Sequence, residues 1–210
     1  MLYTAEVSLS SDGKEYDKIS VPFGIRTLSF SAEKGFLLNG KSMKLKGGCV
    51  HHDNGLLGAA AIDRAEERKV ELMKANGYNA VRCAHNQVSE YFLDACDRLG
   101  MLVIHETFDQ WQKAKREQDY HQFFDEWSDW DLAASVRRDR NHPSVVLWET
   151  ALNESRYPVS LAKEIFELSH AEYPGDQMYT AGDYFGHAEM EPYYDCLLYT
   201  SPSPRDPKTS

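Results

Sequence analysis

Polar side chains that can act on a substrate follow four apolar segments of this chain. Each group comes directly after a short run with strand character. The groups are His51, His52 and Asp53, then Arg82, His85 and Asn86, then Glu106 and Asp109, and last Glu149, Asn153 and Glu154. Parallel strands end at one edge of a sheet, so groups at successive strand ends are expected to meet in space.

The chemistry that this set suits is hydrolysis of a glycosidic bond. In that reaction a carboxylic acid protonates the leaving oxygen. In retaining enzymes a second carboxylate, about 5–5.5 Å from the first, attacks the anomeric carbon. Glu154 is the candidate acid, and the amide of Asn153 can hydrogen-bond a sugar 2-hydroxyl. The Asn-Glu pair alone is weak evidence, because it is also typical of the region before a helix, here one capped by Ser160.

A strand–helix alternation from Lys44 onward is predicted to position these groups. A capping-box-like pair, Asp63 and Glu66, marks the first helix start, and Ser89 caps the second helix. The predicted strands are 45–50, 80–82, 102–104, 145–148 and 178–181, and the helices between them end at Gly77, Gly100, Asp139 and before Pro174. The first helix is expected to bury Ile62, Ala65, Leu72 and Met73.

This alternation predicts an α/β fold with a parallel sheet, best matched by an incomplete (β/α)₈ TIM barrel with about five of its eight strands. A doubly wound sheet is the alternative, although no GxGxxG or P-loop motif supports a nucleotide fold. Residues 1–31 are predicted to be the end of an immunoglobulin-like β-sandwich, and residues 32–196 the N-terminal part of the barrel. Residues 197–210, which contain SPSPRDPKTS, are predicted to be a disordered, non-native tail.

Composition narrows the partners that this chain is expected to bind. The formal net charge of -10 argues against nucleic acid and is compatible with a neutral carbohydrate. No apolar run approaches the roughly 18 residues of a membrane helix, and the first residues lack the pattern of a signal peptide. The cysteines form no CxxC pair. We expect no cofactor and no bound metal.

Four segments resemble motifs of glycoside hydrolase family 2, the group of β-galactosidases and β-glucuronidases, and occur in the family's order. Residues 46–51 (KGGCVH) are similar to R-G-x-N-x-H, 79–86 (NAVRCAHN) to N-A-V-R-x-S-H-Y, 97–106 (DRLGMLVIHE) to C-D-x-x-G-L-x-V-x-D-E, and 138–145 (RDRNHPSV) to R-D-R-N-H-P-S-V. The resemblance covers about residues 20 to 195. It implies hydrolysis of terminal β-linked sugars by a retaining double displacement.

The resemblance also implies a role for each candidate side chain. Glu154 is the general acid/base, and Asn153 contacts the 2-hydroxyl. His85 lines the sugar subsite, and Arg82 supports the nucleophile electrostatically. The further side chains expected near the substrate pocket are His51 and Asp53. The family nucleophile is a Glu after the seventh strand, which is expected to lie beyond this chain, so the 210 residues alone are expected to be inactive.

Departures from the family pattern leave two other functions open. Residues 148–153 read WETALN, one residue longer than the usual W-S-x-G-N-E, so the identity of the sugar is open. His105 stands where Asp is usual, so the metal binding of some members is not carried over. One alternative is a metal-dependent barrel hydrolase with zinc ligands among His51, His52, Asp53 and His85. The other is a non-catalytic carbohydrate-binding homologue.

Overall fold

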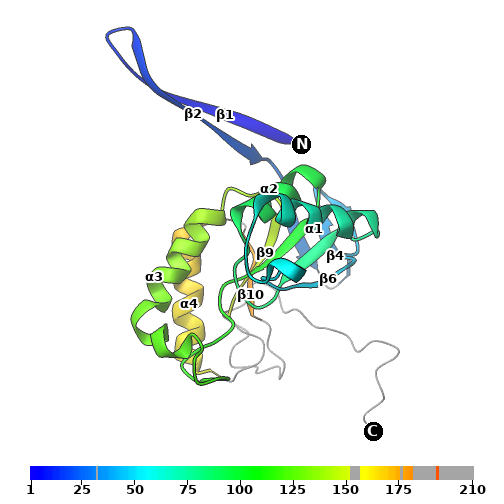
Figure 1. Cartoon of the computed structure of the whole chain (residues 1–210), viewed down its shortest axis with the longest axis vertical. Helices are drawn as coiled ribbons and strands as arrows, with labels where there is room; N and C mark the ends of the chain where they lie inside the picture. Colours follow the sequence, from blue (N-terminus) through cyan, green and yellow to red (C-terminus); the bar gives the residue numbers. More distant parts are fainter. Residues whose placement is uncertain (32, 152–156, 176, 182–192, 194–210) are drawn as a thin grey trace.

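The chain folds around a parallel β-sheet flanked by helices, and a two-stranded ribbon projects from it (Figure 1). The computed structural model describes residues 1–31, 33–151, 157–175, 177–181 and 193. The strands are β1 (Leu2–Ser11), β2 (Lys14–Gly24), β3 (Leu28–Ser31), β4 (Gly35–Leu38), β5 (Lys41–Ser42), β6 (Gly47–Val50), β7 (Ala80–Cys83), β8 (Leu102–Glu106), β9 (Val145–Ala151) and β10 (Tyr179–Ala181). The helices are α1 (Asp63–Ala75), α2 (Glu90–Leu99), α3 (His121–Asp139) and α4 (Val159–Glu172), with a 3-10 turn, η1 (Gly55–Leu57).

The parallel sheet has the strand order β10–β9–β8–β7–β6, so each strand pairs with the one before it in the chain. Helices α1 to α4 connect successive strands. A doubly wound sheet reverses its strand order at a switch point, and the described strands show no such reversal. The predicted α/β alternation and the partial TIM barrel are therefore confirmed.

Side chains of the parallel strands alternate between two apolar cores, as the pleat of a strand requires. Val81 and Val103 belong to a buried cluster formed with the helices. Ala80 and Ile104, on the other face, belong to a second buried cluster together with Phe36 of β4. The sheet is thus covered by helices on one face and by β3–β5 on part of the other.

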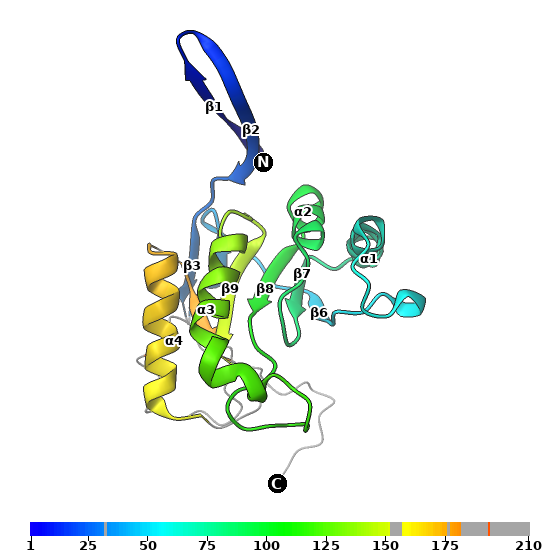
Figure 2. The same ribbon diagram turned by 60° about the vertical axis from the view of Figure 1, so that its left-hand side comes forward.

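Antiparallel strands precede the parallel sheet, as predicted. β1 and β2 form a largely exposed hairpin that extends away from the sheet (Figure 2). β3 lies before the predicted domain boundary at residue 31 and β4 lies after it, and the two strands pair with each other. Leu28 and Phe30 of β3 pack against the second cluster. The assignment of residues 1–31 to an immunoglobulin-like β-sandwich stays a prediction. The predicted tail, 197–210, lies outside the described residues.

Several helix ends follow the predicted chemistry. The Ser89 hydroxyl accepts a hydrogen bond from the Phe92 amide at 3.2 Å and caps α2. Gly100 ends that helix with φ 69°, and Gly77 follows α1 with φ 85°. These left-handed conformations favour glycine because it has no Cβ. None of the described helices is both long and apolar enough to span a membrane.

The predicted capping box at the start of α1 is wrong. Asp63 is the first helical residue and Ile62 occupies the N-cap, without a side-chain cap. Glu66 points into the protein instead and is 1% exposed. Its carboxylate accepts hydrogen bonds from Asn54 Nδ2 at 2.5 Å and from Ser89 Oγ at 3.0 Å. A buried carboxylate needs such partners, and they explain why Glu66 does not reach back to cap its own helix.

Two other details of the helices were also predicted wrongly. Helix α4 begins at Val159 with Pro158 at its N-cap, so Ser160 lies in the first turn rather than capping it. On α1, Ile62 and Leu72 are exposed, at 51% and 45%. The buried positions of α1 include the carboxylate of Glu66, which an apolar periodicity cannot identify.

The pairing of β6 with β7 generates a testable prediction, because Gly47 has no room for a side chain. A Cβ on Gly47 would lie 1.8 Å from the Ala80 carbonyl oxygen, whereas a Cβ on Gly48 would meet nothing nearer than 3.9 Å. We expect Gly47→Ala to lower the free energy of unfolding by about 3 kcal/mol, because a backbone overlap is relieved only by moving the strand. Gly48→Ala is the matched control, within about 1 kcal/mol. Equal urea midpoints for the two variants would contradict this pairing.

Candidate active site

Three charged side chains meet at the carboxyl end of the parallel sheet. Arg82 lies in β7, Glu106 ends β8, and Glu149 lies near the end of β9. Arg82 is opposite Ile104 in the register, and Glu106 is opposite Glu149. Alternate residues of a strand share a face, so all three charged side chains project from the same face of the sheet.

Arg82 bridges the two carboxylates. Its Nε lies 2.6 Å from Glu106 Oε1 and 2.9 Å from Glu149 Oε2, and its Nη2 donates to Glu149 Oε1 at 2.6 Å. Glu106 and Glu149 are 2% and 1% exposed, so Arg82 supplies the charge that makes their shared burial tolerable. Burial opposes the charge of Arg82 itself. The contacts with Glu149 and Glu106 outweigh that effect and raise the pKa of Arg82 above its usual value.

Two histidines extend this group. His85 follows β7, and its Nδ1 lies 2.9 Å from Glu106 Oε2. The carboxylate accepts a hydrogen bond from the Nδ1–H and so sets the orientation of the ring. The exposed ring of His51, after β6, lies edge-on to His85 with 6.2 Å between ring centroids. The structure therefore brings together Arg82, His85 and His51, as the strand-end pattern predicts.

The other predicted site residues have different outcomes. Asp53 is exposed, and its backbone N–H donates to the His51 carbonyl at 2.8 Å. Among the described ion pairs its carboxylate does not join the Arg82 group. Asn153 and Glu154 follow β9, which ends at Ala151, and lie outside the described residues. Their roles stay predictions.

Glu106 and Glu149 were seen in the sequence as strand-end groups but were assigned no role. One signal was present, because an arginine within the apolar strand 80–83 requires a buried counter-charge. The choice of Glu149 depends on a shift in register between β8 and β9, in which Val146 is an extra residue. Without that bulge, Trp148 would stand opposite Glu106, because a one-residue slip reverses every side chain.

A second polar group lies on the helix-facing side of β8. His105 Nε2 lies 2.7 Å from Asp139 Oδ2, and both side chains are fully buried. Arg138 Nε donates to Asp139 Oδ1 at 2.6 Å, and Arg138 Nη2 donates to the Val88 carbonyl at 2.7 Å. Burial opposes the charge of Asp139, but hydrogen bonds from His105 and Arg138 lower its pKa. These contacts tie β8 to the end of α3 and to the loop before α2.

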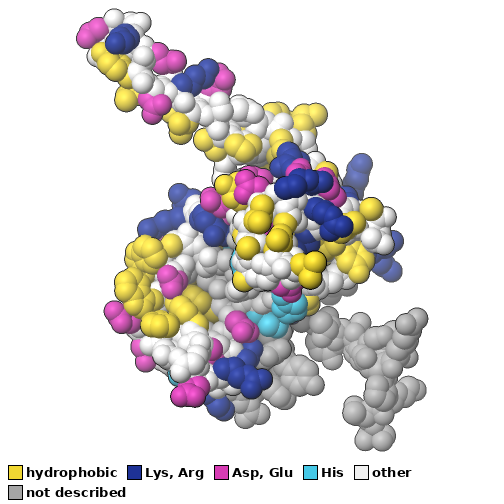
Figure 3. Space-filling view, in the orientation of Figure 1, with side chains coloured by type: hydrophobic (Ala, Val, Ile, Leu, Met, Phe, Trp, Pro, Cys, Tyr) yellow, Lys and Arg dark blue, Asp and Glu magenta, His cyan; other side chains and the backbone are white. Residues whose placement is uncertain are grey.

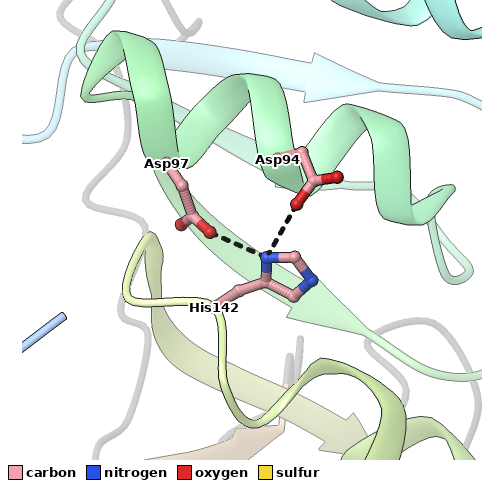
Figure 4. Close-up of side chains that lie close together, drawn as sticks. All are labelled: Asp94, Asp97 and His142. Carbon is pink, nitrogen blue, oxygen red and sulfur yellow. Dashed lines mark hydrogen bonds and ion pairs between the residues drawn. The ribbon is translucent and has the colours of Figure 1, made fainter. Parts of the chain in front are cut away.

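Asp94, Asp97 and His142 lie together at the opposite end of the sheet, between α2 and the loop that enters β9 (Figure 4). His142 Nδ1 lies 2.8 Å from Asp97 Oδ2 and 3.9 Å from Asp94 Oδ1. The other Asp97 oxygen accepts from the Ser144 amide at 2.8 Å. Both oxygens of Asp97 are thus engaged, and the group anchors the start of β9 to α2.

The zinc alternative finds no support in the described geometry. Its predicted ligands were His51, His52, Asp53 and His85. Within the described ranges, three ligand atoms lie within 4.8 Å of one another only in the group of Asp94, Asp97 and His142. The histidines at the carboxyl end instead contact each other edge-on, with His85 directed to Glu106.

The ion pair at the amino end of β9 predicts a pH-dependent stability. Burial opposes the charge of His142, but the hydrogen bond to Asp97 outweighs it and raises the pKa of His142. Such a histidine stabilises the fold fully below its unfolded pKa of about 6.5, and the gain is lost as pH rises through the folded pKa. His142→Gln should therefore cost about 1.5 kcal/mol at acidic pH and less as pH rises.

Urea unfolding between pH 5.5 and 9 measures this effect. In an Asp97→Asn background, His142→Gln should show much weaker pH dependence, because the partner carboxylate is gone. A loss of stability that is equal at both ends of the pH range would contradict the assignment.

The bridging role of Arg82 predicts an asymmetry between buried and exposed ion pairs. Arg82→Met leaves Glu106 and Glu149 buried without a cation and should lower the free energy of unfolding at pH 7 by about 3–5 kcal/mol. Arg98→Met is the matched control, because Arg98 pairs with Glu67 at the surface, where their side chains are 49% and 35% exposed. It should cost no more than about 1 kcal/mol. Equal losses in urea unfolding would show that Arg82 is not a buried bridge.

The chain matches the TIM barrel domain of the family 2 glycosyl hydrolases over residues 31–177. It is 46% identical to a β-galactosidase of Bacteroides ovatus over 147 residues, which are 70% of this chain and 17% of that protein. It is 32% identical to a β-glucuronidase of Bacteroides fragilis over 179 residues, 82% of this chain and 26% of the relative. The chain thus spans about a quarter or less of these relatives.

Solved structures give the same result. A family 2 glycosyl hydrolase from Bacteroides cellulosilyticus superposes with a TM-score of 0.84 at 47% identity, over 91% of this chain and 25% of that one. A β-glycosidase from Bacteroides vulgatus gives a TM-score of 0.81 at 38% identity, over 86% and 23%. The family match covers well over half of the chain, and the chain belongs to glycoside hydrolase family 2, with its parallel sheet forming part of the TIM barrel domain.

Proposed function

We propose that this chain is the N-terminal part of the catalytic barrel of an exo-acting β-glycosidase, which removes terminal β-linked sugars with retention of configuration. The observation that carries the proposal is the group of Arg82, His85, Glu106 and Glu149 at the carboxyl end of the sheet. In barrel enzymes the active site lies at this end. Relatives named β-galactosidase and β-glucuronidase support a carbohydrate substrate.

In this proposal Glu154 acts as general acid and then as general base. Its carboxyl proton passes to the leaving oxygen while the nucleophilic carboxylate forms a bond to the anomeric carbon. Glu154 then removes a proton from the water that displaces that carboxylate. Asn153 hydrogen-bonds the 2-hydroxyl. β9 leads directly to both residues, and its position is fixed by the ion pair between Glu149 and Arg82.

The histidines and Arg82 are proposed to form the wall of the sugar subsite. His85 is 19% exposed and is oriented by Glu106, which suits a ring that hydrogen-bonds a sugar hydroxyl. His51 is exposed beside it, and Asp53, also exposed, is proposed to lie at the mouth of the same site. Arg82 is proposed to support the nucleophile electrostatically, as the family resemblance implies, from a guanidinium that also pairs with Glu106 and Glu149.

The 210 residues alone are proposed to be inactive, because the nucleophile expected from the family resemblance follows the seventh strand and the described parallel sheet has five. General acid assistance without a nucleophile contributes only about 10²–10⁴-fold. The non-catalytic alternative, a carbohydrate-binding homologue, is tested by the same experiment.

The test compares this chain with a form extended to the stop codon of its gene, each assayed on aryl β-galactosides, β-glucuronides and β-mannosides. In the active form, Glu154→Gln should reduce kcat/KM by about 10²–10⁴-fold for a poor leaving group, since that oxygen needs a proton. Glu154→Gln should reduce the rate of glycosyl transfer to the nucleophile far less when the leaving group is dinitrophenolate, which departs without a proton. Glu164→Gln, at an exposed position of α4, is the matched control and should match the parent.

Three outcomes contradict parts of this proposal. Equal effects of Glu154→Gln on good and poor leaving groups would remove Glu154 as the acid. Turnover by the 210 residues alone would place the nucleophile within them and direct attention to Glu106 and Glu149. An extended form that binds sugars without hydrolysing any aryl glycoside would favour the carbohydrate-binding alternative.

A further inference from the structure

The helices around the sheet pack in two pairs. Helix α1 packs on α2 and α3 packs on α4, whereas α2 and α3 barely touch (Figure 2). A cleft of about 520 Å³ lies between the loop before α2 and the side of α3, a size within the range of small-ligand sites. The lining residues that matter here are Asn86, Gln87, Thr107, Asp109, Trp130 and Ser135.

This cleft adjoins the candidate active site but is separate from it. Thr107 directly follows Glu106, and Asn86 directly follows His85. Glu106 and His85 contact each other on the side where Arg82 lies, while Thr107 and Asn86 line the cleft. The cleft therefore lies behind the ends of β7 and β8, between the sheet and the helices.

An exposed tryptophan forms one side of the cleft. Trp130 is 65% exposed, and Trp127 lies edge-on to it with 6.2 Å between ring centroids. Hydrophobic side chains gather on the surface over α3 (Figure 3), where Phe123 is also exposed. A large aromatic ring at the edge of a polar cleft offers a flat apolar face with hydrogen-bonding groups beside it, the arrangement that the C–H face of a pyranose ring and its hydroxyls require.

Polar groups that need partners line the cleft on both sides, because Thr107 follows β8 and Ser135 lies on α3 with Trp130. Thr107 and Ser135 are 5% and 2% exposed, and their hydroxyl oxygens are buried without a hydrogen-bond partner among the described residues. A buried hydroxyl without a partner is unfavourable, so these positions suit a ligand or water that supplies one. The side-chain amides of Asn86 and Gln87 add donors and acceptors, and the Asp109 carboxylate pairs with Lys115 at the cleft.

We propose that this cleft binds a pyranose unit of a larger glycan, at a position distinct from the sugar that is hydrolysed. The inference rests on the proposed function for its substrate class, since it assigns an oligosaccharide rather than a single glycoside. The aromatic face of Trp130 packs on the sugar ring, and the amides and hydroxyls that line the cleft bind its hydroxyl groups. Binding here holds an extended glycan next to the catalytic end of the sheet.

The test titrates β-1,4-galactotetraose and cellotetraose into the extended chain carrying Glu154→Gln, which prevents turnover, with the α-linked maltotetraose as reference. Calorimetry gives Kd for each. Trp130→Ala should raise Kd for a β-linked tetrasaccharide about tenfold, as removal of a central aromatic contact does. Gln87→Ala should raise it by a smaller factor. Phe123→Ala is the matched control, an exposed aromatic residue of α3 outside the cleft, and should bind like the parent.

Two results would overturn the proposal. One is the absence of binding of either β-linked tetrasaccharide below a Kd of about 10 mM. The other is binding that Trp130→Ala leaves unchanged, which would place the glycan elsewhere. Hydrolysis of aryl glycosides is measured separately with Glu154 intact. If binding depends on Trp130 but no aryl glycoside is hydrolysed, only the hydrolase proposal is overturned. If aryl glycosides are hydrolysed but binding does not depend on Trp130, only the cleft proposal is overturned.

Discussion

The structure of the candidate site depends on one arginine that compensates two buried carboxylates. Arg82 connects the ends of β7, β8 and β9 through Glu106 and Glu149. An ion pair buried this deeply is not a reliable source of net stability, because desolvation offsets its attraction. Its effect is to specify geometry, since any register that separates these charges leaves one of them buried alone. The orientation of His85, which is set through Glu106, follows from the same constraint.

The segment 138–145 shows how a motif next to a catalytic strand acts through position. Its first residues, Arg138 and Asp139, hold the buried His105 of β8 on the helix-facing side. Its later residues, His142 and Ser144, bind Asp97 of α2 at the amino end of β9. The motif thus holds β8 through His105, and it holds the start of β9 through Asp97 of α2. These contacts lie on the helix-facing side of β8 and at the amino end of β9, not on the face that carries Arg82 and Glu106, so the motif identifies the site without belonging to it.

Local chemistry explains what the sequence predicted and what it did not. Some signals determine structure within a few residues, namely the apolar runs of the strands, the Ser89 cap and Gly100. The helices and strands, and their order in the sheet, were predicted from such local signals. The partner of Arg82 depends on the bulge at Val146, which arises from packing between strands and has no local signal. Glu66 failed as a cap for the same reason, because its partners lie on other segments. Long-range pairing therefore limited the prediction of the site more than that of the fold.

The two ends of the sheet have different roles, and hydrogen bonds between described residues connect the antiparallel ribbon to the amino end. Asn141 Nδ2 donates to the Pro22 carbonyl at 2.7 Å, and Arg26 donates to the Val145 carbonyl. Gly24 approaches Pro143 so closely that a Cβ would lie 2.5 Å from the ring. The ribbon is thus held by the loop that enters β9, while β9 leaves toward Glu154 at the other end. Changes in the ribbon therefore act at the start of β9, whereas changes at Arg82 act near its end, from β7 across β8, through the ion pair with Glu149.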